Sequence, residues 1–419
     1  MDCPEINSPV RRYKAYVGKY STTQLHLRNP FAIAWWSVAF PGLGHLLLSK
    51  YVRGYLLFIW EIFMNFNGHI NLAILYSFTG RFQMAKDVLD INWVMLYIPT
   101  YIFAIWDSYR CTIDLNHQYI LADRENAEIK AFNMGQFEIN YLDKRTPWNT
   151  AMWSAVMPGL GQVLIQRFPT ALFIIIGFIA VAVEAKLLPA LQYTLLGQFE
   201  YAKAIINPQW MLNVPSIYFF AIYDAYVNAV SVNKLFEWEQ AKFLGKNYQS
   251  EKFIMPFKED ERGESNMYIV STFEHSNYLE LAITAVQMRG IAKEKILGVS
   301  MDRSGENRKI FDSIHSADSL SLFDFPIILA TFFCLFGSIY GFLLTWGPVL
   351  WGIIGIGIGF SLGLLIKVII TKKSKQRYKN LKSTQVVVII ECHETQVEMV
   401  KELLWENNAL GVKSLKLSC

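Results

Sequence analysis

The chain has 419 residues, of which 53% are hydrophobic, 15% aromatic and only 18% charged. It is more apolar than a typical soluble domain, so we expect a multi-pass α-helical membrane protein. The five cysteines have no metal-like spacing and imply no disulfide framework.

Residues 1–28 read as a basic cytoplasmic tail. They contain no long apolar run and no small-residue cleavage site, so no signal peptide is expected. Basic residues that lie directly against an apolar segment favour the inner membrane surface, including anionic lipids, over nucleic acid as the partner. Such residues precede the first apolar segment at Arg11, Arg12, Lys14, Lys19 and Arg28.

An internal repeat follows, at residues 29–116 and 146–233, with a charged connector at 117–145. A shift of 117 positions lays Trp36, Ser37, Pro41, Gly42, Leu43, Gly44, Gly80, Phe82, Ala85, Lys86, Trp93 and Asp107 onto Trp153, Ser154, Pro158, Gly159, Leu160, Gly161, Gly197, Phe199, Ala202, Lys203, Trp210 and Asp224. A repeat of this kind predicts architecture and names no substrate.

Each copy holds three apolar segments and one more polar stretch. Segment A covers 31–48 and 148–165, segment B about 54–72 and 170–188, and segment C 93–110 and 210–227. Between B and C, residues 73–90 and 190–207 have the mixed spacing of a helix in the outer interface, or of a surface loop.

Segment A decides the topology, because it is barely long enough to span and is broken in its middle. Helix-breaking turns are expected at Pro41, Gly42 and Gly44, and at Pro158, Gly159 and Gly161. Basic residues flank both ends of A, which favours a re-entrant hairpin and two spans per copy. In the alternative, A spans fully, the second copy is inverted and residues 117–146 lie outside.

The stretch PGLGHLLLSKYVRG at residues 41–54, with its echo PGLGQVLIQRFPTA, resembles the turn of small two-helix membrane domains found in many bacterial and animal proteins. The second copy has Gln162 where the first has His45. The resemblance implies no activity and carries over no functional residues.

Asp107 and Asp224 are the main candidates for chemistry. Each lies fourteen residues after a tryptophan of the outer belt, deep in the apolar core, where a charge needs a partner. Lys50 and Arg167 occupy matching positions, so we expect the ion pairs Asp107–Lys50 and Asp224–Arg167. An ion or proton path through the two acids is the alternative. Other acids in segment B, Glu61 and Glu184, have no counterparts and are expected to make local hydrogen bonds.

Residues 234–265 are expected to form an amphipathic juxtamembrane segment and a charged linker. Two βαβ units then begin, at 266–303 and 384–419, and together they predict a four-stranded ferredoxin-like sandwich. We expect strands at 267–273, 295–301, 385–391 and 412–417, and helices at 277–289 and 395–407. Residues His275 and His393 fall at corresponding turns and are expected to be helix-start or surface residues rather than metal ligands.

Residues 304–383 interrupt this domain with a linker and a transmembrane hairpin, at 326–344 and 347–369, followed by a basic flank. Glycines recur every four residues, which allows close helix packing within the hairpin, or docking and self-association. They are Gly337, Gly341, Gly355, Gly359 and Gly363. The whole region resembles ferredoxin-like domains with an inserted hairpin, as in bacterial general-stress membrane proteins and a membrane-anchored subunit of alternative complex III.

These patterns predict a non-enzymatic protein of a bacterial plasma membrane, with both termini cytoplasmic and no cofactor. Its expected role is sensing, scaffolding or regulating a membrane complex through an unidentified protein partner, and the chain also has the means to self-associate. The alternative function is a transporter or channel subunit with a site near Asp107 and Asp224.

Overall fold

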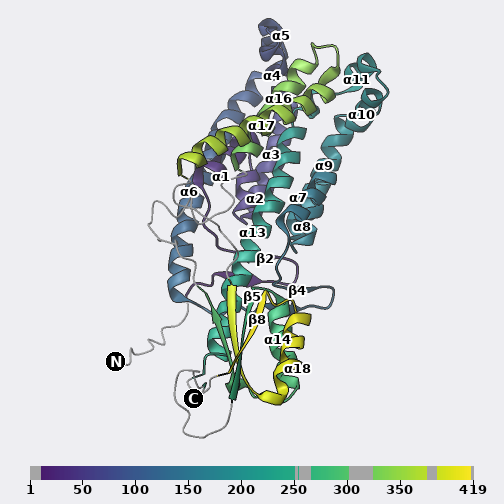
Figure 1. Cartoon of the computed structure of the whole chain (residues 1–419). Coiled ribbons are helices and arrows are strands. Elements are labelled where there is room, and N and C mark those ends of the chain that lie inside the picture. The colour runs from purple at the N-terminus through teal and green to yellow at the C-terminus, as the bar shows by residue number, and fades with distance from the viewer. Residues whose placement is uncertain (1–10, 251–252, 254–265, 302–323, 375–384, 417–419) are drawn as a thin grey trace. The chain divides into compact units, whose positions relative to one another are not determined.

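A computed structural model describes residues 11–250, 253, 266–301, 324–374 and 385–416. The chain divides into two compact units (Figure 1). The helical unit comprises residues 1–140, 145–231 and 308–377, and the sheet unit comprises 141–144, 232–307 and 378–419. Described residues are mostly helical, at 67%, with a small sheet region.

The helical unit is built from two series of elements, here called the first half and the second half. The first half consists of β1 (Ala15–Val17), β2 (Thr22–Gln24), α1 (Pro30–Ala39), α2 (Leu43–Leu47), α3 (Tyr51–Gly68), α4 (Ile70–Phe78), α5 (Phe82–Val88) and α6 (Ile91–Glu125). The second half consists of β3 (Phe132–Met134), β4 (Ile139–Tyr141), α7 (Pro147–Val156), α8 (Leu160–Leu164), α9 (Phe168–Glu184), α10 (Leu187–Leu195), α11 (Phe199–Ile205), α12 (Pro208–Met211) and α13 (Val214–Asn247).

From β3 to α12, every element of the second half begins 117 residues after its counterpart. Residues 117 positions apart also share unusual backbone φ angles. Ser49 and Gln166 both have a φ of 58°, and His69 and Lys186 have values of 52° and 54°. Because non-glycine residues seldom adopt a positive φ, these matched turns show that the two halves share their connections as well as their helices.

Two β-hairpins lie where the sequence predicts a tail and a connector. β1 pairs with β2 and β3 pairs with β4, each pair closed by a turn that contains a glycine. The Gly18 amide donates to the Ser21 carbonyl over 3.0 Å, and the Gly135 amide donates to Glu138 over 2.9 Å. The correspondence between the halves therefore starts fourteen residues before the predicted boundary at residue 29.

The predicted segment A forms two short helices that fold back on each other. α1 has ten residues, about 15 Å at 1.5 Å per residue, which is half of a roughly 30 Å hydrocarbon core. After the turn at Gly42, whose φ is 98°, α2 brings Gly44 against Ile33 and Ser37 of α1. A side chain at Gly44 would collide with both. α7 and α8 repeat this hairpin, with Gly161 packed against Thr150 and Ser154.

The predicted outer stretch between B and C is two helices rather than one. α4 and α5 are separated at Gly80 (φ 76°), and α10 and α11 are separated at Gly197 (φ 74°). Segment C is also longer than predicted, because α6 runs to Glu125 and α13 to Asn247.

One described helix, α17 (Gly347–Ser374), is long and apolar enough to cross a membrane, through residues 347–366. Two bent pairs meet the same test if each counts as one span: α5 with α6, bent by 93°, and α9 with α10, bent by 63°. The described residues thus supply between one and three such spans.

The helices α16 (Asp324–Gly341) and α17 form an antiparallel pair with touching backbones. A β-carbon at Gly337, Gly355 or Gly359 would meet backbone atoms of the partner helix at less than 3.0 Å. The predicted helix-packing glycines Gly341 and Gly363 lie equally close to Pro348 and Pro326. The five glycines therefore pack within the hairpin. α17 also contacts α10 and α11 of the second half.

The sheet unit contains one antiparallel sheet of order β6-β7-β5-β8. Its strands are β5 (Asn266–Glu274), β6 (Ile296–Ser300), β7 (Gln385–His393) and β8 (Gly411–Lys416). Helices α14 (Asn277–Met288) and α18 (Val397–Glu406) pack their buried aliphatic side chains against Ile269 of β5 and Val388 of β7. Strand β5, from one half of the C-terminal third, therefore pairs with β7 and β8 from the other.

The end of α13 belongs to the sheet unit, where the sequence predicts a juxtamembrane linker. Leu244 is fully buried in the core of the sheet unit, and the Gly298 amide of β6 donates to the Tyr248 carbonyl over 2.9 Å. Helix α13 thus contributes residues to both units. The charged run at 258–265 lies outside the described residues.

Candidate functional site

Asp107 lies in a buried cluster with two basic partners from the first half. Its Oδ2 atom accepts a hydrogen bond from Arg53 Nη1 over 2.7 Å and lies 3.0 Å from His45 Nε2. The Asp107 side chain is 3% exposed, whereas that of Arg53 is 51% exposed. The predicted ion pair between Asp107 and Lys50 is therefore wrong. Lys50 makes no ion pair in the part of the chain that the structure describes, and Arg53, in the first turn of α3, pairs with Asp107 instead.

Asp224 holds the corresponding position in the second half. Arg167 Nη1 donates to its Oδ1 over 2.8 Å, and the two side chains are 2% and 0% exposed. Gln162 Nε2 donates to Oδ2 over 3.0 Å, and Asn228 Nδ2 donates to Oδ1 over 2.8 Å. This charge is fully enclosed and fully hydrogen-bonded.

The two clusters share one design with different side chains. His45 and Gln162 stand at matching positions, and both point at the aspartate of their own half. The cation differs, because it comes from α3 in the first half and from the residue that precedes α9 in the second. The short α1–α2 and α7–α8 hairpins therefore serve to bring a polar side chain to each acid.

Arg167 also joins the two halves. Its Nη2 atom donates to the Leu46 carbonyl of α2 over 3.2 Å and lies 3.4 Å from the Tyr51 hydroxyl. The main chain is held as well, since the Phe168 amide donates to the Tyr20 carbonyl and Ser21 forms a β-bridge with Arg167. One guanidinium thus contacts the acid of its own half and the backbone of the other half.

Around these clusters the contact between the halves is apolar and aromatic. Trp36 of α1 is fully buried, with ring centroids 5.5 Å from Phe220 and 5.1 Å from Tyr223 of α13. Phe58 of α3 meets Phe173 of α9 at 4.9 Å. These aromatic contacts lie between the two clusters' halves and contain no charged side chain.

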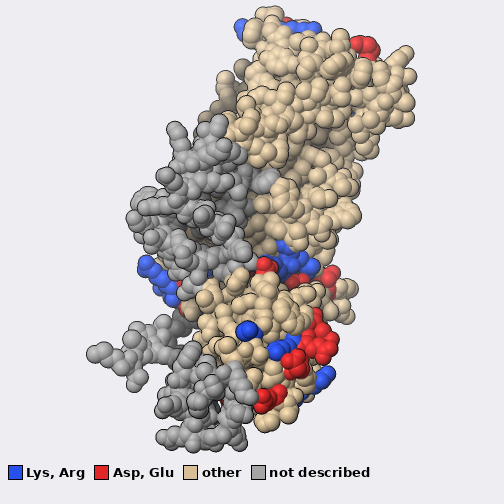
Figure 2. Space-filling view, in the orientation of Figure 1, with Lys and Arg blue, Asp and Glu red and all other residues tan. Residues whose placement is uncertain are grey.

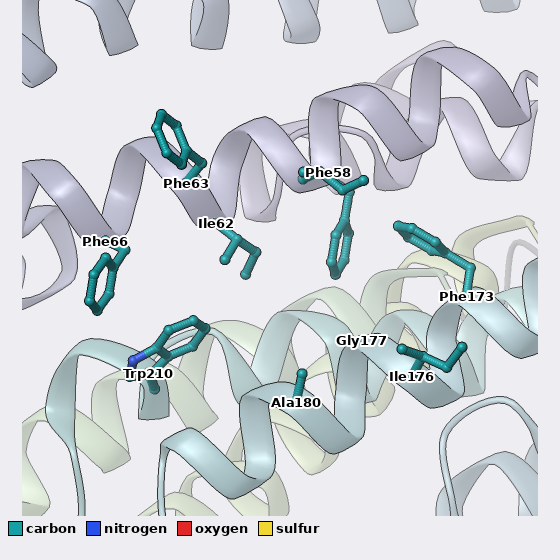
Figure 3. A pocket seen from close by; sticks show the side chains of 10 residues that line it. Phe58, Ile62, Phe63, Phe66, Phe173, Ile176, Gly177, Ala180 and Trp210 are labelled. Carbon is teal, nitrogen blue, oxygen red and sulfur yellow. The ribbon is translucent and has the colours of Figure 1, made fainter.

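A groove of about 530 Å³ lies between α3 and α9 (Figure 3). Its walls are hydrocarbon and aromatic, with Gly177 and Ala180 leaving room on α9. The other lining residues are Phe58, Ile59, Ile62, Phe63, Phe66, Phe173, Ile176 and Trp210. Such a surface offers no group that acts as a base, a nucleophile or a metal ligand.

A second polar cluster, which the sequence did not indicate, joins α3 and α4 to the start of α12 and α13. We call it the amide cluster: Asn65, Asn71, Gln209 and Asn213. Asn71 Nδ2 donates to the Gln209 carbonyl and to Asn213 Oδ1, both over 2.9 Å, and Gln209 Nε2 donates to Asn65 Oδ1 over 2.8 Å. All four side chains are buried. At the 117-residue offset Asn65, Asn71 and Asn213 align with apolar residues, and Gln209 aligns with Asn92, so no identical residue drew attention to the cluster.

The histidines of the sheet unit occupy different environments. His275 is 1% exposed and lies between Gln240 of α13 and Ser300 of β6, at 3.0 Å from each. It lies two residues before α14, at the helix start that was one of the two predicted places, and it is buried rather than on the surface. His393 is exposed and accepts a hydrogen bond from the Thr395 amide at the start of a helical turn. No group of three His, Cys, Asp or Glu able to hold a metal occurs in the described residues.

Burial changes the ionisation of two groups in the sheet unit. Desolvation, reinforced by the nearby Glu280 carboxylate, raises the pKa of Glu239 on α13 to about 7. Burial likewise raises the pKa of the Cys392 thiol on β7. An elevated thiol pKa makes Cys392 a poor nucleophile.

Part of the predicted basic tail is neutralised within the chain. Arg12 forms an ion pair with Glu125, and Lys14 Nζ lies 2.7 Å from Asp123, both at the end of α6. These two residues are therefore engaged by acids of the protein itself.

In three comparisons with known proteins, no family model, no curated protein and no solved structure matches this chain.

Proposed function

We propose that this protein is a non-enzymatic, multi-pass membrane protein in which a duplicated helical module carries a ferredoxin-like domain and acts as a scaffold or regulatory subunit of a membrane complex. The observation that carries the proposal is the pairing of both buried aspartates with basic residues of their own half. Acids engaged in this way hold helices together and leave no free charge for a transported ion.

Membrane insertion is supported by the surface of the helical unit. Many large apolar side chains of α3 and α9 are exposed, among them Leu56, Ile59, Phe63, Leu172, Ile176 and Val183. Figure 2 shows charged side chains near α5 and α11, at one end of the unit, and an almost uncharged face along the helices beside them. A surface of this kind suits contact with lipid.

For topology we propose that the α1–α2 and α7–α8 hairpins are re-entrant and that both termini and the sheet unit are cytoplasmic. The halves then have the same orientation. A single cysteine at position 124, in a cysteine-free background, should resist an impermeant reagent added to intact cells and react after the cells are opened. Labelling from outside would favour the alternative with three spans in each half.

The sheet order β6-β7-β5-β8, with one helix in each βαβ unit, supports a ferredoxin-like domain. Such sheets serve widely as docking surfaces, an argument from fold analogy. Crosslinking in intact cells followed by purification should recover one membrane partner in a fixed ratio. Removing β8 should abolish the capture while leaving membrane insertion intact.

Transport is the competing function, and a flux measurement separates the two. We expect vesicles reconstituted with the purified protein to show no proton or cation flux above that of empty vesicles. A flux that Asp107→Asn abolishes without lowering thermal stability would overturn the scaffold proposal.

A further inference from the structure

Glu61 of α3 differs from the two aspartates because no basic residue of the described part of the chain pairs with it. Its side chain is 4% exposed. Oε1 lies 3.1 Å from Asn65 Nδ2 and 3.3 Å from the Tyr97 hydroxyl, and Oε2 is buried with no hydrogen-bond partner among the described residues. As a carboxylate, Glu61 would keep a bare charged oxygen away from water and from any cation.

The groups that the structure describes around Glu61 are neutral amides and tyrosines. The amide cluster lies next to it through Asn65, which also bonds to Asn71 and Gln209. From α6 it faces Tyr97 and, one turn further on, Tyr101, whose hydroxyl donates to the Val38 carbonyl over 2.7 Å. Tyrosines and amides offer hydrogen bonds but no positive charge to balance a carboxylate.

A bound proton resolves the geometry. With the proton on Oε1, the acid donates to the Tyr97 hydroxyl oxygen and still accepts from Asn65 Nδ2. Oε2 is then a neutral carbonyl oxygen, which costs far less to leave unpaired than a charged one. The amide cluster is not arranged to hold a metal cation that would balance a Glu61 carboxylate. Its Asn65, Asn71 and Asn213 side-chain oxygens already accept hydrogen bonds from neighbouring amides.

We propose that Glu61 is a proton-binding site, occupied at neutral pH, that keeps the first half joined to the second through the amide cluster. This proposal depends on the proposed function only because it assumes that α3 lies in the bilayer. Loss of the proton would create a charge beside Asn65 and draw it away from Gln209, the residue that links α3 to α12. The counterparts of Glu61 and Tyr97 are Phe178 and Val214, so the site belongs to the first half alone.

Infrared spectroscopy of the purified full chain tests the assignment. The Glu239→Gln background is used throughout, because Glu239 is also partly protonated near pH 7. At pH 7 we expect a carbonyl-stretch band of a protonated carboxylic acid that disappears when Glu61→Gln is added. It should persist in the control Glu200→Gln, whose side chain is exposed and paired with Lys203. A band that is absent from the background protein, or unchanged when Glu61→Gln is added, would overturn the proposal.

Two further measurements extend the test, and the first of them does not require Glu61→Gln to fold. Tyr97→Phe removes the hydroxyl acceptor and should shift the band, and an unshifted band would count against the assignment. The melting temperature of the background protein should fall between pH 6 and pH 9 more steeply than that of the same protein with Glu61→Gln added, because the native state holds a proton that the unfolded chain has released above about pH 5. Equal slopes would argue against it. Neither the infrared spectrum nor the slope of the melting temperature depends on the labelling result at position 124. A failure of the Glu61 proposal can therefore be told apart from a failure of the proposed topology.

Discussion

Arg167 and Asp224 form a fully enclosed ion pair, with Nη1 and Oδ1 2.8 Å apart. Because the same guanidinium bonds to the Leu46 carbonyl, the pair stabilises the second half and its contact with the first. Removing one member of such a pair leaves an uncompensated buried charge.

We therefore expect Asp224→Ala to destabilise the protein by about 3–5 kcal/mol, the cost of an orphaned buried charge. Thermal unfolding in detergent would measure the loss. In the double variant with Arg167→Ala, part of the loss should return, because neither charge then remains. Strictly additive losses would show that the two side chains act independently.

The first half offers a direct comparison of two basic residues. Arg53→Ala should lower stability and couple to Asp107→Ala in a double-mutant cycle, because Arg53 is the residue that bonds to the carboxylate. Since Arg53 is half exposed and His45 also contacts Asp107, a loss of about 1–2 kcal/mol is expected. Lys50→Ala serves as the matched control, and coupling of Lys50 to Asp107 would contradict the structure.

The glycines of α17 predict a position-specific effect. A β-carbon at Gly355 would collide with the Phe333 carbonyl, whereas one at Gly357 has nothing within 4 Å. Gly355→Ala should therefore cost about 1–3 kcal/mol by overpacking, and Gly357→Ala should be close to neutral. Pulse proteolysis of the two variants would compare them, and equal resistance would rule out close packing at Gly355.

Strand register is open to a chemical test. Met267 of β5 faces Cys392 of β7 across the sheet, and both are buried on the same side. Met267→Cys should form a disulfide with Cys392 on oxidation during refolding, because directly opposed β-carbons are close enough. Tyr268→Cys, which faces the other side of the sheet, should not. Peptide mapping by mass spectrometry would identify the bond, and a link from position 268 would indicate a shifted register.

Glu239 predicts how acidity affects the sheet unit. Its folded pKa of about 7 lies above the unfolded value near 4.3, so the native state binds the extra proton. This contribution to stability is fully present below about pH 4 and is lost as the pH rises through 7. Glu239→Gln should flatten the fall in melting temperature between pH 5 and pH 8, whereas the exposed Glu294→Gln should leave it unchanged. An unaltered slope in Glu239→Gln would contradict the assignment.

Elements with a strong hydrophobic period were predicted within a few residues. The runs MYIVSTF and 385–391 became β5 and β7, because a sheet with one buried face fixes the alternation of apolar residues. The run at 395–407 became α18, because its apolar residues recur at helical spacing. The three-residue strands β1 to β4 carry no such period. Gly18 and Gly135, at the 117-residue offset, were the signal that indicates their turns.

Side-chain partners were harder to predict than elements. Lys50 was assigned to Asp107 because it aligns with Arg167, yet sequence alignment cannot say which residue of α3 faces α6. Glu61 and the members of the amide cluster have no identical counterparts, so a search for repeated residues passes over them. Pairing depends on helix rotation, and that is decided by the packing of the whole unit.

The reach of Arg167 to the Leu46 carbonyl has an evolutionary consequence. In a homodimer of the first half alone, Lys50 would occupy the position of Arg167. A lysine ammonium lacks the planar guanidinium group, whose N–H donors bond to two acceptors in fixed directions. The halves are therefore not interchangeable, because only the second carries the arginine that contacts both. A single self-associating copy of the first half would lack the contact that joins the two halves.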